Sequence, residues 1–376
     1  GNCEQIGTES TFTHKVPSDE SKNIKALPYE MPDHATAIQV VVKTLTDPEH
    51  GVISSMDEID AVGHRVLHGA EKFSGSVLVT DDVEEAIKEC FELGPLHNPA
   101  NLTGIKACQK IMKGVPQVAV FDTGFHQTMP DYAYMYALPY EYYEKYGIRR
   151  YGFHGTSHRY VSQRVCEFLG VKPEGKKIIT CHIGNGASVA AVKYGKVIDT
   201  SMGLTPLAGL MMGSRSGDID PSAVTYMMQK SGMTPQEMSE YLNKKSGVLG
   251  VAGISSDMRD NENADNEGNK LAHLALQMYN YRIKKYIGAY AAAMNGVDII
   301  VWTAGVGENQ EGVRWDSCAD MEYLGVKMDR ERNHCRGVEQ VLSADDSKVK
   351  VVMIPTDEEI VIARDTLALV TGKELD

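Results

Sequence analysis

Long apolar runs, paired cysteines and excess positive charge are all missing from this sequence. The nearest candidate for a membrane-spanning helix, residues 287–302, is interrupted by Asn295, Gly296 and Asp298. The seven cysteines are scattered and include no Cys-x-x-Cys pair, which favours a reduced, cytoplasmic protein. Lys and Arg number 38 against 51 Asp and Glu, giving a formal net charge of -13. We therefore expect no nucleic acid and no membrane among the main partners.

Two common catalytic signatures are absent as well. His154 and His158 have the spacing of two metal ligands on one helix face, but there is no Glu between them and no evident third ligand. Residues 155–159, GTSHR, do not match the Gly-x-Ser-x-Gly turn of a serine hydrolase. A metal-dependent hydrolase that uses His154 and His158 stays an alternative, which metal analysis of the purified protein tests.

The residues that are present suit an anionic ligand. Residues 178–198 contain three short apolar runs separated by Asn185-Gly186 and by Gly195, a pattern that predicts a β-hairpin continued into a meander. Four glycines follow within residues 203–217, with Arg215 between the last two. Glycine-rich turns expose backbone N–H groups and a guanidinium can pair two oxygens, which is what a phosphate needs. The alternative is that these glycines only form tight turns.

The order of the expected elements indicates an α/β fold, and 376 residues allow two domains. Strands are expected at 59–67, which carries Arg65, and at 118–121, which ends on Asp122. A helix is expected over 271–294, followed by a strand at 297–303 that opens into a Gly-x-Gly turn. The first thirty or so residues have weak strand character. The acidic, Asn-rich residues 257–268 are expected to form a solvated loop.

At two predicted helix starts, some carboxylates have a structural role and one is a candidate metal ligand. Asp220 before Pro221 has the pattern of a helix cap. Thr356 and Glu359 fit a capping box, which explains Glu359 but leaves Glu358 without a structural role. A spare carboxylate in a glycine-rich phosphate site suits Mg²⁺, so Glu358 is the candidate metal ligand.

Seven segments resemble the signatures of the acetokinase family, in the family's order and over nearly the whole chain: residues 64–69 (HRVLHG), 95–99 (PLHNP), 121–130 (FDTGFHQTMP), 151–158 (YGFHGTSH), 182–186 (HIGNG), 213–221 (GSRSGDIDP) and 303–309 (TAGVGEN). The resemblance implies the actin, hexokinase and Hsp70 architecture, in which two ribonuclease H-like domains flank a cleft. It places one domain at residues 1–123 plus 359–376 and the nucleotide-binding domain at 124–358. It also implies reversible transfer of the γ-phosphoryl group of MgATP to acetate, with Mg²⁺ or Mn²⁺ as the metal, and a homodimer.

The same resemblance assigns roles to individual residues. Arg65 and Arg215 hold the carboxylate and the phosphoryl oxygens, and His154 hydrogen-bonds the phosphoryl group. Asp122 orients the arginine and substrate side of the site, and Glu358 positions the metal. The pocket for the acetate methyl group corresponds to Leu67, Leu96, Phe153 and Pro206. The nucleotide is assigned to a larger set: His182, Gly184, Asn185, Gly186, Asp257, Met258, Arg259, Gly305, Val306, Gly307, Glu308 and Asn309.

The sequence departs from the family pattern at two places that bear on function. Leu67 stands where Val is expected, and because a methylene is worth only about 1–3 kcal/mol in such a pocket, propionate is expected to be a poorer second substrate. The family's first strand and its Asn-x-Gly-Ser-Ser-Ser-x-Lys phosphate loop have no counterpart ahead of residues 1–7, so we expect either a sequence that lacks the protein's N-terminal segment or a protein whose first domain has lost its first strand. The alternatives are a propionate or butyrate kinase and, if the loop is truly absent, a noncatalytic nucleotide-binding scaffold.

Overall fold

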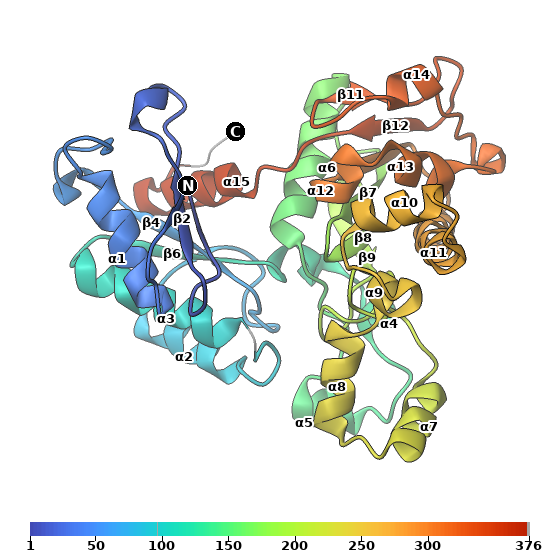
Figure 1. Cartoon of the computed structure of the whole chain (residues 1–376), viewed down its shortest axis with the longest axis horizontal. Helices are drawn as coiled ribbons and strands as arrows, with labels where there is room; N and C mark the ends of the chain where they lie inside the picture. The colour runs from blue at the N-terminus through green and yellow to red at the C-terminus, as the bar shows by residue number, and fades with distance from the viewer. Residues whose placement is uncertain (96, 374–376) are drawn as a thin grey trace. The chain divides into compact units, whose positions relative to one another are not determined.

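The computed structural model of the chain describes residues 1–95 and 97–373. The chain divides into two compact units, Gly1–Phe121 with Glu359–Asp376, and Asp122–Glu358. In Figure 1 the first unit contains the blue and cyan elements together with the red helix α15 (Glu358–Thr371), which closes the chain.

The first unit begins with an antiparallel sheet of three strands, β1 (Asn2–Glu4), β2 (Thr11–His14) and β3 (Ile24–Pro28). Helix α1 (His34–Leu45) contributes Ala37 and Val40 to a small core with Phe12 and Met31. The sequence predicted only weak strands here. The pairing is irregular, because the register between β2 and β3 shifts after Phe12.

A second sheet of the first unit carries the strand with Arg65. Strands β4 (Val62–Val66) and β6 (Gln117–Phe121) are parallel, and β5 (Val77–Leu78) pairs with β6 antiparallel. Helices α2 (Asp81–Glu89) and α3 (Asn98–Ile111) cover this sheet through Ile87, Leu102 and Ile105. Thr80 caps α2, its hydroxyl accepting from the N–H of Val83 at 3.4 Å.

The second unit is built on one sheet of six strands in the order β11-β12-β10-β7-β8-β9. Strands β7 (Lys177–Ile183), β8 (Ala187–Lys193) and β9 (Lys196–Thr200) are antiparallel neighbours, so the predicted hairpin and meander are confirmed. Strands β10 (Ile299–Thr303) and β12 (Lys350–Met353) extend the sheet parallel to β7. The short β11 (Gln340–Val341) pairs antiparallel with β12.

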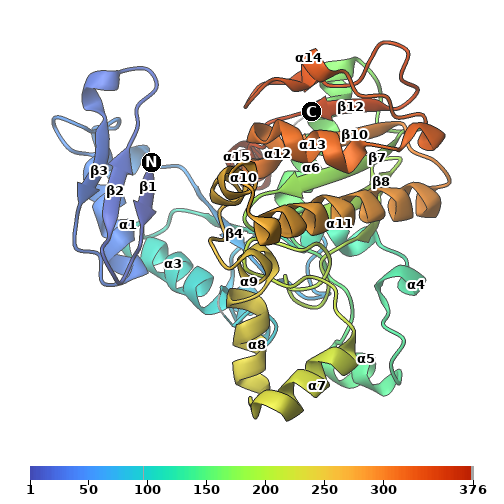
Figure 2. The same ribbon diagram turned by 45° about the vertical axis from the view of Figure 1, so that its right-hand side comes forward.

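Long helices pack on this sheet. Helix α6 (Gly155–Leu169) buries Val161 and Val165 against Ile178 of β7 and Val192 of β8. Helix α11 (Lys270–Met294), predicted at 271–294, contacts β7 and β8, and Figure 2 shows it running across these strands. Because side chains alternate along a strand, residues 178, 180 and 182 of β7 share one face, the face that α6 covers.

The remaining helices of the second unit are shorter than α6 and α11: α4 (Asp131–Tyr134), α5 (Glu141–Tyr146), α7 (Pro221–Ser231), α8 (Pro235–Lys244), α9 (Gly247–Ala252), α10 (Met258–Asn266), α12 (Ala304–Asn309), α13 (Glu311–Cys318) and α14 (Arg330–Asn333). Asp220 caps α7 as predicted, accepting from the N–H of Ser222 at 2.8 Å. The solvated loop expected at 257–268 is wrong. Asp257 caps α10 through the N–H of Arg259, and the helix buries Met258 and Asn261 beneath its charged surface.

The described residues contain no helix that is both long and apolar enough to span a bilayer. Parallel and antiparallel strands occur in the same sheet and helices pack on it, so the predicted α/β class is confirmed.

Candidate active site

His154 stands at the start of α6 in a left-handed backbone conformation, with φ at 58°. Its Nδ1 lies 2.9 Å from Oγ of Ser188 on β8, and its ring stacks on that of His182, with centroids 4.0 Å apart and planes 23° apart. His182 is held in turn by Ser157, whose Oγ lies 2.8 Å from its Nδ1. Two independent supports therefore fix the plane and the direction of the His154 ring.

Asp122 follows β6 directly and is fully buried. Its carbonyl accepts a hydrogen bond from the N–H of Gly155 at 3.0 Å. A Cβ at Gly155 would lie 2.1 Å from that carbonyl oxygen, so only glycine fits at this position. The close approach joins Asp122 to the entrance of α6, next to His154.

Arg215 and His154 face the same point on the glycine turn between β7 and β8. A Cβ added to Gly186 would lie 3.4 Å from Nη1 of Arg215 and 3.7 Å from both Cε1 and Nε2 of His154. Burial lowers the pKa of Arg215, but a guanidinium stays charged at neutral pH. Gly186 thus leaves room for a small anionic group between a cation and an imidazole.

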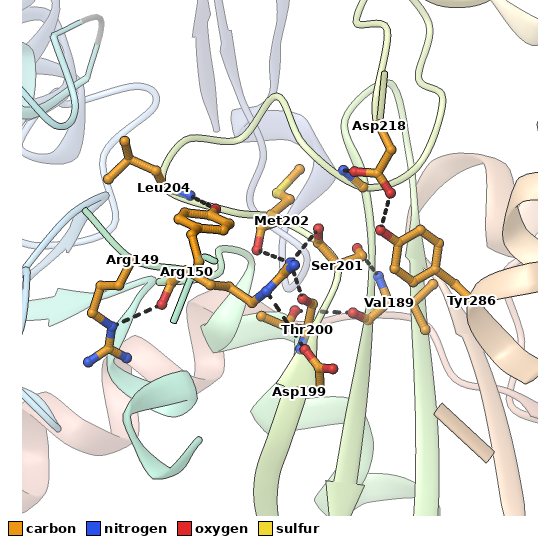
Figure 3. Close-up of polar contacts among 12 residues, drawn as sticks. Arg149, Arg150, Val189, Asp199, Thr200, Ser201, Met202, Leu204, Asp218 and Tyr286 are labelled. Carbon is orange, nitrogen blue, oxygen red and sulfur yellow. Dashed lines mark hydrogen bonds and ion pairs between the residues drawn. The ribbon is translucent and has the colours of Figure 1, made fainter. Parts of the chain in front are cut away.

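Arg215 belongs to an irregular segment, residues 201–218, that is anchored at both ends. At one end Arg150 donates from Nη1 to the carbonyls of Thr200, Ser201 and Met202, at 2.6, 2.9 and 3.0 Å (Figure 3). The carboxylate of Asp199 lies 3.8 Å from the same guanidinium.

At the other end Asp218 accepts from the N–H of Gly209 at 2.7 Å and also from the hydroxyl of Tyr286 on α11, as Figure 3 shows. The N–H of Asp218 donates back to the carbonyl of Gly209 at 2.9 Å. These contacts close the segment into a loop whose position is set by the sheet and by α11.

Most of the predicted nucleotide-binding residues of the second unit line one cavity of about 450 Å³. Its walls come from the glycine turn after β7, the start of α10 and helix α12: Gly184, Asn185, Gly213, Ser256, Asp257, Met258, Arg259, Gly305, Val306, Asn309 and Gln310. The side chain of Asn185 lies directly against Gly213, where a Cβ would come within 2.1 Å of its Oδ1.

Some predicted nucleotide ligands have structural partners. The carboxylate of Glu308 accepts from the N–H of Ala304 at 2.7 Å and of Thr356 at 3.1 Å. It therefore holds the turn after β10 to the segment that leads into α15. Asp257 caps α10 and also pairs with the guanidinium of Arg259 at 2.5 Å, which lowers the pKa of its carboxyl.

The predicted substrate residues are divided between the two units. In the first unit, Arg65 is an exposed residue of β4, and Leu67, just after the strand, is buried. In the second unit, Phe153 is fully buried, and the carbonyl of Pro206 accepts from Arg215 at 3.4 Å. Leu96, the fourth member of the predicted methyl pocket, lies outside the described residues.

Glu358 is the first residue of α15 and is half-buried. The capping box expected from Thr356 and Glu359 is wrong, because α15 begins at Glu358 and the residue before it is Asp357; the Thr356 hydroxyl shares a 2.8 Å hydrogen bond with Ser157. No group of three or more acidic, His or Cys side chains within the described ranges could hold a metal ion. A single carboxylate fits a metal such as Mg²⁺, which takes most of its ligands from phosphate oxygens and water.

His158 is not available as the second ligand of the alternative zinc site. Both ring nitrogens of His158 are hydrogen-bonded, Nδ1 to Thr180 at 2.7 Å and Nε2 to Ser188 at 2.7 Å. Thr180, Ser188 and Ser256 were not among the site residues predicted from the sequence. The alternation of β7 and β8 places Thr180 and Ser188 on the α6 face, so the predicted hairpin register contained the signal for these two.

Comparison with known proteins places the chain among carboxylate kinases. Residues 1–364 match the model of the acetokinase family. The acetate kinase of Phocaeicola vulgatus is 62% identical over 370 residues, covering 98% of this chain and 92% of the relative. The acetate kinase of Thermotoga maritima is 60% identical over 374 residues, with the same two coverages.

Two crystal structures have the same fold. The structure of Porphyromonas gingivalis acetate kinase matches with a TM-score of 0.92 at 53% identity, and that of a Francisella tularensis propionate kinase with 0.89 at 40%. Each match covers 98% of this chain and 92% of the other. The predicted fold of two ribonuclease H-like domains is confirmed by the first of these matches. A match of sequence and fold over nearly the full length leaves one assignment: the chain belongs to the acetokinase family.

Proposed function

We propose that this chain is an acetate kinase that transfers the γ-phosphoryl group of MgATP to acetate, reversibly, giving acetyl phosphate and ADP. The observation that carries the proposal is the meeting of Arg215 and Nε2 of His154 at Gly186. Gly184 and Asn185 of the same turn line the cavity assigned to the nucleotide. The γ-phosphoryl group of a nucleotide in that cavity is expected at Gly186.

The chemistry needs no general base, because a carboxylic acid is already ionised at neutral pH. The barrier comes from bringing two anions together, so the site must align them and neutralise charge on the transferring group. We assign Arg65 and Arg215 to the carboxylate and phosphoryl oxygens, and His154 to a hydrogen bond with the phosphoryl group. Asp122 orients this side of the site. The γ-phosphoryl group passes in line and directly from ATP to acetate, leaving ADP, with no intermediate on the protein.

Glu358 is assigned to Mg²⁺ or Mn²⁺. Bound with the nucleotide, the metal would supply positive charge that offsets the negative charge of the phosphoryl groups. Within the protein, the segment leading to Glu358 is held by the bonds of Thr356 to Glu308 and Ser157. Ser157 also contacts His182, so the candidate metal ligand and the His154 stack share supports.

The acid is recognised by a small apolar pocket to which we assign Leu67, Leu96, Phe153 and Pro206. The Francisella relative is a propionate kinase, and a propionate or butyrate kinase is therefore the second candidate. Leu67 favours acetate, since a larger side chain than the family's Val leaves less room for another methylene.

A hydroxylamine trap tests the proposal and separates these candidates. Acyl hydroxamate is measured with MgATP and acetate, propionate or butyrate at equal concentrations. Acetate is expected to give the highest kcat/KM, with propionate lower by roughly 10-fold or more. The variant Leu67→Val should narrow that ratio. Higher activity with propionate would make the chain a propionate kinase, whereas binding of MgATP without any acyl product would identify a nucleotide-binding scaffold.

The expected assembly and location also remain proposals. We propose that the two compact units are the two domains, with a boundary near residues 121–124 and 358–359. We propose a homodimer, which the exposed α7 supports: none of its residues is buried, and Tyr226 is 59% exposed. All seven cysteines are free thiols, which supports a reducing, cytoplasmic location.

A further inference from the structure

A chain of three hydrogen bonds runs behind His154, between α6 and the sheet. Oγ1 of Thr180 lies 2.7 Å from Nδ1 of His158, and Nε2 of His158 lies 2.7 Å from Oγ of Ser188. Oγ of Ser188 then lies 2.9 Å from Nδ1 of His154. Thr180, His158 and Ser188 have no solvent exposure, so water does not compete for these bonds.

The direction of the chain follows from counting hydrogens. Complete burial lowers the pKa of His158 well below its usual value, and the nearby His126 and His182 add to the shift. His158 is therefore neutral and has a single ring N–H. Within the described parts of the chain, the Thr180 hydroxyl has one partner, Nδ1 of His158. If His158 donated from Nδ1, the buried Thr180 hydrogen would have no acceptor, so Thr180 donates to Nδ1 instead.

The other two bonds are then determined. With Nδ1 accepting, the His158 proton is on Nε2 and is donated to the oxygen of Ser188. Ser188 has one hydrogen, which it donates to Nδ1 of His154. A neutral imidazole that accepts at Nδ1 carries its proton on Nε2. Nε2 is the His154 nitrogen that lies beside Gly186 and Arg215.

We propose that Ser188 and His158 are positioning residues that hold His154 as the neutral tautomer with its proton on Nε2. This inference rests on the proposed function for its consequence, because that N–H is the donor a phosphoryl oxygen needs. In the opposite tautomer a bare lone pair would face the phosphoryl oxygens. The stacked His182 ring fixes the plane of His154, whereas the Ser188 bond selects the nitrogen that carries the hydrogen.

The test is a two-bond ¹H–¹⁵N spectrum of protein labelled with ¹⁵N-histidine, recorded near neutral pH without ligands. The wild-type protein is expected to show His154 as the Nε2–H tautomer, with assignment by loss of its signals in His154→Gln. In Ser188→Ala, His154 should populate the Nδ1–H tautomer or become charged. The kcat for acyl phosphate formation should fall by about 10- to 100-fold, the usual range for residues that orient a functional ligand, with little change in KM for ATP.

Further variants separate positioning from folding. Ser162→Ala removes a buried hydroxyl from the same helix, one turn after His158, and should leave the His154 spectrum unchanged. If Ser188→Ala does not fold, the near-isosteric Thr180→Val removes the first donor and should also mix the tautomers, whereas Thr180→Ser should retain the wild-type spectrum.

Two results would overturn the proposal: a wild-type His154 with its proton on Nδ1, or an Nε2–H tautomer that survives both Ser188→Ala and Thr180→Val. The spectrum does not depend on turnover. An Nε2–H tautomer lost in Ser188→Ala would support the positioning chain even in a protein that makes no acyl phosphate, a result that would contradict only the proposed function.

Discussion

At the scale of single residues, the site depends on close approaches that leave no room for a side chain. Gly155 is the clearest case, because its Cβ position is 2.1 Å from the carbonyl oxygen of Asp122. The contact is with backbone, which cannot rotate away. The residue that follows His154 in the sequence is thus fixed by packing rather than by chemistry.

Gly155→Ala is expected to reduce the free energy of unfolding by about 1–3 kcal/mol, the usual cost of an overpacked position. It should also reduce activity, since relief of the clash must move Asp122 or His154. Gly312→Ala on α13 is the matched control: nothing lies within 4 Å of its Cβ position, and alanine favours a helix by up to about 1 kcal/mol. Urea denaturation of both variants measures the difference. Equal stabilities would mean that the Asp122 contact is not rigid.

His126 is expected to make the free energy of unfolding depend on pH. It is fully buried, donates from Nε2 to the carbonyl of Phe153 at 2.9 Å, and burial lowers its pKa to about 4. In the unfolded chain a histidine titrates near 6.5. Above pH 6.5 neither state is protonated at His126. As the pH falls from about 6.5 to about 4, only the unfolded state gains the proton, so stability decreases over that window.

The expected loss is about 2 kcal/mol at pH 5 relative to pH 7, at roughly 1.4 kcal/mol for each pH unit below 6.5. His126→Gln, which keeps a donor for Phe153, should lack this part of the pH dependence. The exposed His34→Gln should retain it. Urea unfolding at the two pH values compares all three proteins, and a wild-type dependence in His126→Gln would show that another group is responsible.

At the scale of elements, the segment 201–218 illustrates how an irregular loop is made rigid. One guanidinium, that of Arg150, satisfies three successive carbonyls at the end of β9. The Asp218 carboxylate closes the far end onto Gly209 and α11. Arg215 and Pro206 both lie between these anchors, so the precision of the candidate site depends on the anchors as well as on the sheet.

Arg150→Gln is expected to lower the free energy of unfolding by about 2–3 kcal/mol, because carbonyls lose charged hydrogen-bond donors. Amide hydrogen exchange over residues 200–218 should accelerate, and kcat/KM for acetate should fall. Arg164→Gln is the control, since Arg164 pairs with Glu339 at the surface and such pairs contribute about 1 kcal/mol or less. Unchanged exchange in Arg150→Gln would locate the anchor elsewhere.

The elements that could be predicted are those whose signals are local. Asn185-Gly186 predicted the turn between β7 and β8, and Asp220 predicted the start of α7. The sheet of β1, β2 and β3 was not clear, because Ala26 has a positive φ within β3 and the register shifts, which breaks the alternation. Helix α10 was missed because only Met258 and Asn261 of its nine residues are buried.

Individual residues of the candidate site could be proposed from the sequence, but the hydrogen bonds and contacts that join them could not. Arg215 and His154 were identified from their motifs. Their meeting at Gly186, and the bonds from Thr180 through Ser188, depend on how α6 docks on β7 and β8. Docking is a tertiary property, so no local pattern contains it. Thr356 is a second example. The sequence predicted it as a helix cap, but its hydroxyl forms a hydrogen bond with the hydroxyl of Ser157 on α6.

At the scale of the whole molecule, the exposed Tyr226 of α7, a helix with no buried residue, favours the proposed assembly with a second copy. Tyr226→Lys is expected to raise the dimer dissociation constant at least roughly 10-fold, because a buried aromatic is commonly a dominant contact in an interface. Tyr29→Lys, at a 41% exposed tyrosine of the first unit, is the matched control. Sedimentation velocity over a range of concentrations measures both. A monomeric wild-type protein, or a dimer indifferent to Tyr226→Lys, would rule out this interface.

We expect the group of residues around Gly186 to transfer a phosphoryl group to acetate. The most direct measurement is a ³¹P NMR time course of the purified protein with acetate and MgATP. We predict an acyl phosphate signal that requires acetate, disappears on addition of hydroxylamine, and forms about 100- to 1,000-fold more slowly with Arg215→Ala or His154→Ala. ATP converted to free phosphate without acetate, or acyl phosphate formed at the wild-type rate by both variants, would contradict the account.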